Sequence, residues 1–480
     1  MAYVKNDVTT VTITPLRAYW ECSEMEVSRL KAKLTAVDKN KHFNPRYKEG
    51  RWDGKKTFFN EYKRECPSGL AHDAVEFLKS QGHTVRVEYA DCRLPSPRPD
   101  AQINYEITAD HQLRALSAML ENRRGIINAA TNSGKTKIAQ AWCALSDLKT
   151  LYLVPSRELL NQTVESFQRD TNLSVGRIAA DKAWTIGDDV TVALVTSFSK
   201  RKNKKTNKIL NQDAVAAFNA IASQFEAVIV DECHHMTATT WQWVLTRLTN
   251  AHFRFGLSGT PWEPGDYMAE LEVKSQLGPV LAVVKNDELM DLGWSATPTI
   301  HMIHVDEYVS KKEGYLEAYE QGIVYSEMRN GWIVKLARLI ASEGKNCLIF
   351  STRLAQCDIL FQMLKGFNVD CRLLTGQTDK AVRKDELQSF REGGFPVLIS
   401  NVMSEGVDIP SLSGLIFASG GKSHKQLLQR IGRGIRKKPA GENVVEIFDF
   451  NDTSHKSLKR HTEHRLRAYE AEGFKIVFQD

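Results

Sequence analysis

The sequence has no continuous apolar run of about 18 residues, the length that a membrane-spanning helix requires. Its first residues lack the apolar core of a secretory signal peptide. Its eight cysteines are scattered and form no Cys-x-x-Cys pair, which argues against a structural zinc site or a disulfide framework. We therefore expect an intracellular protein, located in the cytoplasm and without a membrane contact.

The sequence also has little net charge for its length. Its 64 lysines and arginines oppose 58 acidic residues, which leaves a formal charge of +6. An excess this small identifies no partner by itself, so the places where basic residues cluster matter more. The 480 residues are enough for about three domains.

One stretch carries a pattern typical of nucleotide binding. An apolar segment at 125–129 is followed by a short loop and a helical pattern, and the loop comprises Ala130, Thr131, Asn132, Ser133, Gly134, Lys135 and Thr136. Backbone N–H groups in such a P-loop surround a polyphosphate, and the following helix favours its negative charge. Gly134 lets the backbone approach, Lys135 reaches the β- and γ-phosphates, and the Thr136 hydroxyl can ligate Mg²⁺.

A carboxylate pair follows another expected strand, at 226–230. This strand ends in the sequence Asp231-Glu232-Cys233-His234. Ligand sites of α/β proteins lie at the carboxyl ends of parallel strands, and we expect this strand to neighbour the P-loop strand. Asp231 would then hold Mg²⁺, and Glu232 would orient and deprotonate an attacking water. The combination predicts hydrolysis of a nucleotide with Mg²⁺.

Short apolar segments that alternate with helical patterns predict two parallel α/β domains, at 98–294 and 295–455. Helices are expected at 157–168 and 331–341. The expected strands are 125–129, 150–154, 190–195, 226–230 and 253–257 in the first domain, and 346–350, 370–374, 396–400, 414–418 and 444–448 in the second. A smaller α+β unit precedes them at 1–97 and a basic helical tail follows at 456–480.

The N-terminal unit contains a segment rich in both basic and aromatic residues. Residues 39–64 include nine lysines and arginines against three acidic residues, interleaved with Phe43, Tyr47, Trp52, Phe58, Phe59 and Tyr62. Basic side chains neutralise phosphates and aromatic faces stack on bases. The alternative is a small sheet with an aromatic core and a solvated basic face, in which residues 52–55 form a turn between strands.

Two other basic segments allow two interpretations. Residues 199–208 contain six basic residues and no acidic one, which fits either a solvated loop or a loop that grips a phosphate backbone. Arg430, Arg433 and Arg436 recur at a spacing that places them near one face of a helix. They form either a basic surface or arginine fingers that stabilise charge on a transferring γ-phosphoryl group.

The order of these motifs resembles superfamily 2 helicases of the DExH type. The resemblance covers about 110–440 and rests on Gln112, the P-loop, 154–159, Thr196-Ser197, 231–234, 258–260, 348–351, Thr375-Gly376, 404–408 and 429–436. It implies two RecA-like motor domains and DNA or RNA as the partner. It also implies that Gln112 contacts adenine, that Gly406 and Asp408 couple the nucleic-acid track to the ATP site, and that the nucleic-acid backbone is contacted by Arg157, Ser197, Thr375 and Gly376.

Residues 43–47 and 52–55 of the N-terminal unit are similar to the N-terminal domain of phage UvsW-type helicases. Residues 325–330, before the second motor domain, are similar to the same family. This resemblance implies a monomer, in the cytoplasm of the host cell if the chain is encoded by a phage. It implies action on branched DNA: branch migration of Holliday junctions, fork regression, and dissociation of D-loops and of R-loops, which contain RNA. DNA contacts are then expected at Arg46, Trp52 and Lys55. An RNA helicase, a duplex translocase without strand separation and a nucleotide-gated scaffold remain alternatives.

Overall fold

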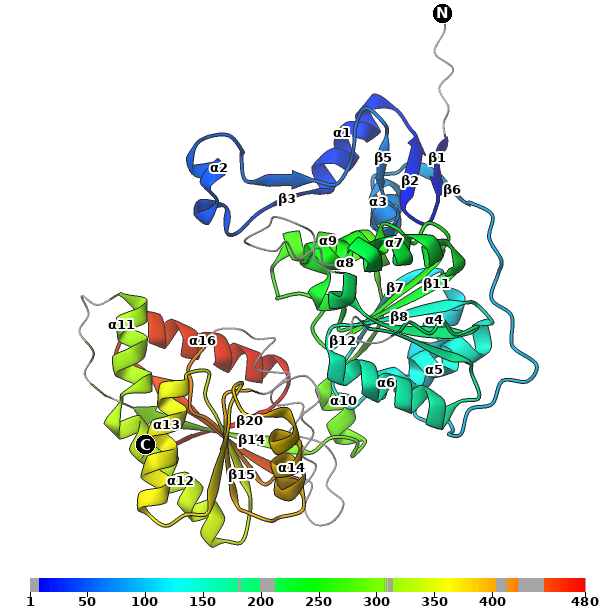
Figure 1. The fold of residues 1–480 in the computed structure, drawn as a ribbon. Helices are drawn as coiled ribbons and strands as arrows, with labels where there is room; N and C mark the ends of the chain where they lie inside the picture. The colour runs from blue at the N-terminus through cyan, green and yellow to red at the C-terminus, as the bar shows by residue number, and fades with distance from the viewer. Residues whose placement is uncertain are drawn as a thin grey trace, which may run out of the picture. The chain divides into compact units, whose positions relative to one another are not determined.

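The computed structural model describes residues 8–179, 183–198, 212–305, 307, 309, 314–402, 412–421 and 444–479. The chain divides into two compact units, Met1–Val284 and Lys285–Asp480. Each unit contains one seven-stranded sheet, and all strand pairings within these two sheets are parallel (Figure 1). The prediction of two RecA-like parallel α/β domains preceded by a small α+β domain is confirmed.

The first large sheet has the strand order β13-β7-β12-β11-β8-β10-β9. Its inner strands are continuous apolar runs, as expected for strands that helices cover on both faces. The strands are β7 Arg124–Ala129, β8 Thr150–Val154, β9 Val175–Ile178, β10 Val190–Leu194, β11 Ala227–Asp231, β12 Phe253–Ser258 and β13 Val280–Val284. The five strands expected in this domain are all present, whereas β9 and β13 were not expected.

Helices cover both faces of this sheet (Figure 1). One face carries α4 Asp110–Glu121, α5 Lys135–Ser146 and α6 Arg157–Asp170. The other carries α7 Gln212–Ile221, α8 Thr239–Leu245 and α9 Tyr267–Leu277. The helix expected at 157–168 is α6, which begins after Ser156, whose hydroxyl accepts a hydrogen bond from the Leu159 N–H at 3.2 Å.

The N-terminal domain has a four-stranded sheet of order β5-β2-β1-β6, in which β1 pairs antiparallel with β2 and parallel with β6. A separate antiparallel pair, β3–β4, extends from it. The elements are β1 Val8–Ile13, β2 Arg17–Glu21, α1 Glu24–Lys33, β3 Thr35–Val37, α2 Pro45–Lys48, β4 Lys55–Thr57, β5 Glu65–Pro67, α3 Ala71–Ser80 and β6 Thr84–Tyr89. The expected turn at 52–55 does not join two strands, because β3 ends at Val37 and a long connection precedes it.

This N-terminal domain packs against α9 of the first α/β domain. Leu271 of α9 belongs to the apolar core of the N-terminal domain, and the Lys274 ammonium lies 2.9 Å from the Asp73 carboxylate of α3. The Tyr267 hydroxyl donates to the Lys33 carbonyl at 2.8 Å. Apolar burial and polar contacts therefore both join the small domain to the first motor domain.

The second large sheet has the strand order β16-β17-β15-β18-β19-β14-β20. Its strands are β14 Thr297–Val305, β15 Cys347–Phe350, β16 Cys371–Leu374, β17 Val397–Ser400, β18 Gly414–Phe417, β19 Val444–Asp452 and β20 Lys475–Gln479. The described helices of this unit are α10 Asn286–Asp291, α11 Tyr315–Tyr319, α12 Glu327–Ser342, α13 Leu354–Gly366, α14 Lys380–Arg391 and α16 Lys456–Ala471.

Two expected boundaries differ from the structure. The units divide after Val284 instead of after 294, because α10 belongs to the second unit, where Met290 packs on its core. Residues 456–480 are not a separate tail. Tyr469 of α16 is buried in the same core, and β20 pairs with β14 at the edge of the sheet. The polar sequence of α16 hides this packing, because its buried residues include paired charges.

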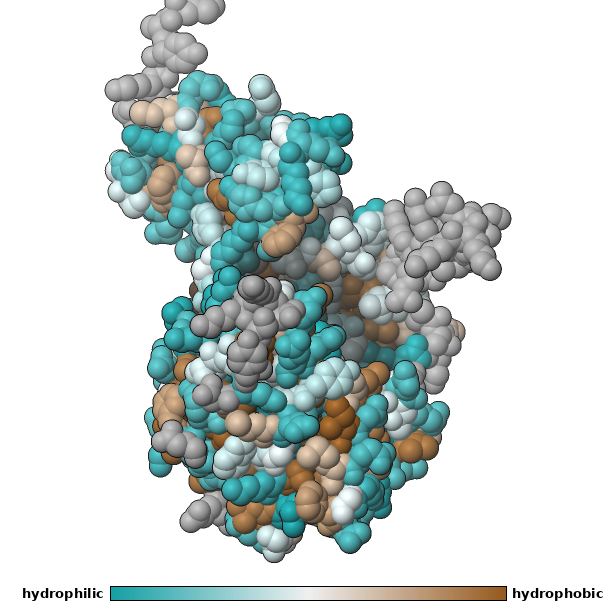
Figure 2. Space-filling model, turned by 90° about the vertical axis from the view of Figure 1, so that its left-hand side faces the viewer, coloured by the Kyte–Doolittle hydropathy of each residue, from teal (hydrophilic) through white to brown (hydrophobic). Residues whose placement is uncertain are grey.

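Among the described helices, none is long and apolar enough to cross a membrane. The face drawn in Figure 2 is largely hydrophilic, with apolar side chains in small scattered groups. Isolated apolar residues on a surface are normal and need no partner.

Candidate ATP and nucleic-acid sites

The P-loop lies between β7 and α5, as predicted. Gly134 caps α5 in the left-handed region at φ 82°, and Asn132 also has a positive φ of 74°. A Cβ atom at Gly134 would lie 2.2 Å from Gln112 Nε2, so this position requires glycine on two grounds. The sharp turn brings the loop N–H groups and the start of α5 together, which is the geometry that binds phosphate.

Lys135 is held close to its own loop. Its ammonium group donates to the carbonyls of Ala129 at 2.9 Å and Ala130 at 3.2 Å. Its positive charge opposes the effect of burial on the pKa values of both Asp231 and Glu232, which places the three groups in one electrostatic environment. Ala130, Thr131 and Thr136 belong to the same loop and helix start.

Helix α4 supports the loop from behind. The Gln112 amide donates to the Ser133 carbonyl at 3.0 Å, and His111 Nε2 lies 3.2 Å from the same oxygen. Both side chains are buried. The structure therefore places Gln112 at the nucleotide loop, where its amide nitrogen holds the loop backbone through the Ser133 carbonyl.

The acidic pair lies at the carboxyl end of β11, on the same edge of the sheet as the P-loop. The expectation that this strand directly neighbours the P-loop strand is wrong, because β12 pairs with both β11 and β7. The end of β12 thereby brings Ser258 between the two motifs: Ser258 is paired with Asn128 in the sheet register. Ser258 is small enough for the side chain of His234, which follows β11, to contact its hydroxyl.

Glu232 is oriented by a short polar chain. His234 Nδ1 lies 3.2 Å from Glu232 Oε2 and 3.1 Å from Ser258 Oγ. The Ser258 hydroxyl also accepts from the Thr260 N–H at 3.2 Å. Glu232 itself has φ 49°, so the chain turns sharply at the carboxylate. The segment 258–260 is thus connected to the acidic motif through His234.

The two carboxylates have opposite pKa shifts. Burial, together with the neighbouring charge of Glu232, raises the pKa of Asp231 above its ordinary value. Burial also acts on Glu232, but the hydrogen bond from His234 and the charge of Lys135 outweigh it and lower its pKa. Glu232 is therefore ionised at neutral pH, as a proton acceptor or water-orienting group must be.

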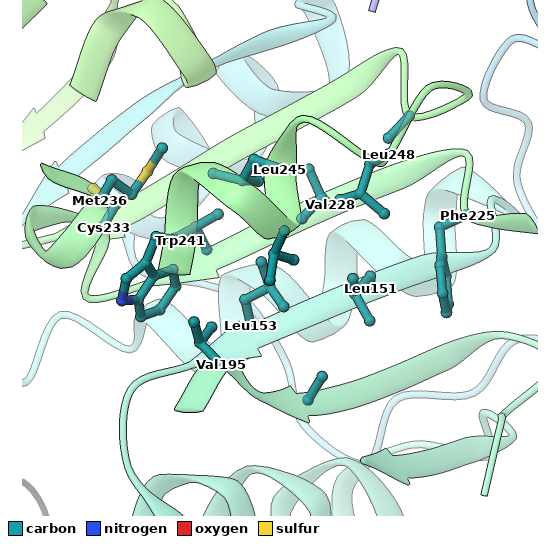
Figure 3. Packing of buried hydrophobic residues seen from close by; sticks show 14 of the residues in the cluster. Leu151, Leu153, Val195, Phe225, Val228, Cys233, Met236, Trp241, Leu245 and Leu248 are labelled. Atoms are coloured by element: carbon teal, nitrogen blue, oxygen red, sulfur yellow. The ribbon is translucent and has the colours of Figure 1, made fainter. Parts of the chain in front are cut away.

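The acidic motif is anchored in the apolar core of the first α/β domain (Figure 3). The Cys233 and Met236 side chains are fully buried beside Trp241 and Leu245 of α8. Burial of these side chains fixes the backbone that presents Glu232 and His234. A rigid support of this kind is what positions a reacting group.

The predicted nucleic-acid residues of the first motor domain lie at the same sheet edge. Arg157 is exposed at the start of α6, directly after β8. Ser197 is buried in the short helical turn Val195–Phe198, directly after β10. The Arg157 side chain thus lies at the surface, whereas the Ser197 side chain is part of the domain interior.

Thr375 and Gly376 follow β16 in the second unit. The Gly376 N–H donates to Asn401 Oδ1 at 3.1 Å, and the Arg383 guanidinium donates to the Thr375 carbonyl at 2.7 Å. Both residues therefore lie in a loop that side chains hold in place. Four further predicted site residues, Gly406, Asp408, Arg433 and Arg436, lie outside the described residues, as does the basic segment 199–208.

In the N-terminal domain, the predicted contacts lie around the β3–β4 extension. Arg46 and Lys55 are exposed, and the partly exposed Trp52 donates from Nε1 to the Lys55 carbonyl at 2.7 Å. The aromatic residues of the segment divide into two groups, because Phe59 is buried whereas Tyr62 is 92% exposed. The aromatic core of the alternative interpretation is thus present at Phe59, and DNA contact by the exposed residues stays a prediction.

The sequence prediction gave no role to His111 and His234, and it did not foresee the contact between His234 and Ser258. His234 and Ser258 belong to motifs that were found, but their role depends on a strand order that periodicity does not reveal. His111 directly precedes Gln112 on the helix that backs the loop. Its contact with the loop carbonyl could have been suspected only from that position.

Three protein families match the chain in order. They are the N-terminal domain of the DNA helicase UvsW at residues 16–88, the res subunit of type III restriction enzymes at 106–263, and the helicase conserved C-terminal domain at 332–438. Each match falls on one of the three domains described above.

Similar proteins agree with these matches. The ATP-dependent DNA helicase uvsW of Enterobacteria phage T4 is 25% identical over 458 residues, which cover 90% of this chain and 88% of that protein. The DNA 3'-5' translocase XPB2 of Sulfurisphaera tokodaii is 26% identical, with coverage of 74% and 84%.

A solved structure supports the fold. A fragment of a putative HsdR subunit of a type I restriction enzyme from Vibrio vulnificus YJ016 has a TM-score of 0.56 at 15% identity, covering 78% of this chain and 70% of that one. Together with the P-loop, the acidic pair and the two parallel sheets, the matches show an ATP-hydrolysing helicase, similar to the phage UvsW helicases.

Proposed function

We propose that the protein is an ATP-driven DNA translocase that remodels branched DNA: it migrates Holliday junctions, regresses forks and dissociates D-loops and R-loops. The single observation that carries this proposal is the UvsW-type N-terminal domain, packed on a motor domain whose P-loop and acidic pair meet at one sheet edge. The names of both relatives specify DNA, which favours DNA over RNA as the track. We further propose that the protein acts as a monomer.

The residues of the first motor domain fit a nucleotide with Mg²⁺. The Lys135 ammonium has only backbone carbonyls as hydrogen-bond acceptors, and the buried Ser133 hydroxyl has no hydrogen-bond partner within the described part of the chain. We propose that Thr136 and Asp231 hold Mg²⁺, since a hydroxyl, a carboxylate and phosphates suit this ion. The ion would neutralise charge on the transferring phosphoryl group.

Glu232 is proposed to orient the attacking water and accept its proton, with His234 as the residue that positions it. Lys135 is proposed to stabilise the γ-phosphate. Gln112 is proposed to contact adenine through the part of its amide that does not bond the loop. For Gly406, Asp408, Arg433 and Arg436, roles in coupling and in charge stabilisation remain predictions from the resemblance.

DNA is proposed to be held mainly through its backbone, by Arg157, Ser197, Thr375 and Gly376 in the motor domains and by Arg46, Trp52 and Lys55 in the N-terminal domain. Phosphate contacts carry little sequence information, so binding should depend on DNA structure and on salt. The buried position of Ser197 limits it to a contact through its backbone or through a neighbour.

The test compares ATP-dependent processing of a four-way junction, a fork, an R-loop and a plain duplex of matched length. We expect product from the three branched substrates and little from the duplex. Equal rates on the duplex would contradict a branch-specific role and favour the duplex-translocase alternative. ATPase stimulation by DNA and by RNA of equal length separates the proposal from the RNA-helicase alternative.

A further inference from the structure

A second polar site lies far from the P-loop, where the N-terminal domain meets the first motor domain. A cavity of about 340 Å³ opens between α3 and β6 on one side and the connection from α4 to β7 on the other. Arg123 and Arg124 line it from the motor domain, and His72 and Lys79 line it from α3. Four basic side chains therefore surround one small space.

Among the residues that the structure describes, the hydrogen-bond partners of Arg124 are all neutral. Its guanidinium donates to the Ser68 hydroxyl, to the Pro15 carbonyl at 3.2 Å and, more weakly, to the Thr14 carbonyl at 3.5 Å. Its Nε atom is buried and has no hydrogen-bond partner within the described ranges. Burial, with the charge of nearby Arg123, lowers the pKa of Arg124 to about 10, which still leaves it charged at neutral pH.

Arg123 is held flat beside it. Its guanidinium lies 4.4 Å from the ring centre of Tyr89 and 6.0 Å from that of Phe253. One nitrogen donates to Cys92 Sγ at 3.1 Å, a weak acceptor. Stacking on an aromatic face fixes the plane of an arginine and leaves its remaining N–H groups available at the edge.

Among the described residues that line the cavity, the one carboxylate is paired with a lysine and not with either arginine. Glu76 is the one acidic residue among the described residues that line it, and its carboxylate lies 3.0 Å from the Lys79 ammonium. Arg254, a fully buried cation near Arg124, donates to three backbone carbonyls and brings no negative charge to the arginines. Charges that are partly withdrawn from water are stabilised by a counter-charge, so two half-buried arginines side by side favour the binding of an anion.

We propose that this cavity binds a phosphate group between Arg123 and Arg124. Paired guanidinium groups match the oxygens of phosphate, and the volume admits a phosphate with part of an attached sugar. The source is either a backbone phosphate of DNA or free inorganic phosphate. Because the walls belong to two domains, the bound anion would strengthen the contact between them.

The site is distinct from the ATP site. Arg124 begins β7 and Ala129 ends it next to the P-loop, so the length of the strand separates the two sites by about 17 Å. The inference does not rest on the proposed action on branched DNA. The phosphate site can therefore be disproved while the action on branched DNA stands, and the action on branched DNA can be disproved while the phosphate site stands.

The first arm of the test titrates inorganic phosphate into the full-length Lys135→Ala protein by calorimetry, at an ionic strength held constant with chloride. The Lys135 substitution weakens phosphate binding at the P-loop. Further substitution of Arg123→Gln should weaken the remaining binding by about tenfold or more, the scale of a charge-assisted hydrogen bond. Asn122→Asp should act in the same direction, because it adds a negative charge to the lining and keeps both arginines.

Arg86→Gln is the matched control. It removes the same charge from β6, where Arg86 is exposed and paired with Glu88, outside the cavity. It should leave phosphate binding unchanged. Thermal unfolding of each variant checks that the fold is retained, and Asn122→Asp keeps the inference testable if Arg123→Gln unfolds.

The second arm measures the salt dependence of duplex and junction binding for the unmodified protein, Arg123→Gln and Arg86→Gln. If the anion is a DNA phosphate, Arg123→Gln should reduce the slope of log K against log salt by about 1 and Arg86→Gln should not. An effect of Arg123→Gln on free phosphate alone identifies a free anion as the ligand. If Arg123→Gln matches Arg86→Gln in both arms and Asn122→Asp leaves phosphate binding unchanged in the first, the inference is overturned.

Discussion

The two α/β units have the same architecture but treat charge differently at the carboxyl edges of their sheets. In the first unit, Lys135 donates to backbone carbonyls, although Asp231 and Glu232 are near enough for their pKa values to respond to it. In the second, Asp449 and Asp452 at the end of β19 are buried and paired with arginines. The lysine of the first unit thus contacts carbonyls close to two carboxylates, whereas in the second unit ion pairs join arginines and aspartates inside the core.

The paired charges of the second unit form one network. Arg329 of α12 is fully buried, pairs with Asp452 and donates from Nε to the Ala418 carbonyl at 2.7 Å. Arg465 of α16 lies 2.7 Å from Asp449 and 3.5 Å from Asp452. The network joins α12 and α16 to β19, so helices from different parts of the chain depend on it.

The largest expected effect concerns Lys135 in the first unit. Lys135→Ala should lower the ATPase kcat on the order of 10³-fold, because it removes a positive charge from the site where charge develops. Stability should change little, since the lysine bonds only loop carbonyls. Lys137→Ala, on the exposed face of the same helix, is the control and should keep its ATPase. Steady-state ATP hydrolysis measures both, and a Lys135→Ala protein with normal turnover would refute the site.

The second prediction concerns the ion-pair network of the second unit. Arg329→Met should lower the free energy of unfolding by about 3 kcal/mol, because Asp452 would lose a partner in a buried setting. Arg338→Met, exposed on the same helix, should change it by less than about 0.5 kcal/mol. Urea unfolding gives both values. If the two variants are equally stable, the network is not structural.

The third prediction sharpens the account of the first site. His234→Ala should lower the ATPase kcat by about tenfold and leave KM for ATP nearly unchanged, because His234 orients Glu232 without a proposed contact to nucleotide. Its loss should cost less than that of Lys135, which acts on the phosphate itself. A rise in KM with constant kcat would mean that His234 serves nucleotide binding instead.

Much of this comparison could be predicted from the sequence, because the strands that carry it are local patterns. All ten expected strands are present in the structure, and the P-loop and the acidic pair lie at one sheet edge as expected. Strand order could not be predicted, because periodicity says nothing of which strands pair. The insertion of β12 and the link from His234 to Ser258 therefore emerged only in three dimensions.

Packing between distant segments was equally hidden. Residues 456–480 were expected to be a tail because their sequence is basic and polar. In the structure Arg465 is buried, and it forms ion pairs with Asp449 and Asp452. Phe59 and Tyr62 are close in sequence and alike in chemistry, but one is buried and the other is exposed. Which aromatic residue is core depends on the surrounding fold, and the residue type alone does not decide it.

The smallest expected effect concerns the joint that only the first unit has, between the N-terminal domain and α9. Asp73 lies 2.9 Å from Lys274, and both side chains are partly buried. Burial alone would raise the pKa of Asp73, but the hydrogen bonds from His72 and Lys274 outweigh it and lower the pKa. Asp73→Asn should therefore cost about 1 kcal/mol of stability at neutral pH, in the range of a partly exposed ion pair.

The sign of its pH dependence follows from the lowered pKa. The folded protein holds Asp73 ionised more strongly than the unfolded chain does, so this contribution is complete above the ordinary pKa of about 4 and is lost as the pH falls through the lower folded value. The difference in unfolding free energy between the unmodified protein and Asp73→Asn should thus shrink on acidification. Glu76→Gln, on the exposed side of the same helix, is the control. A difference that stays constant from pH 7 to about pH 3 would show that the pair does not hold the joint.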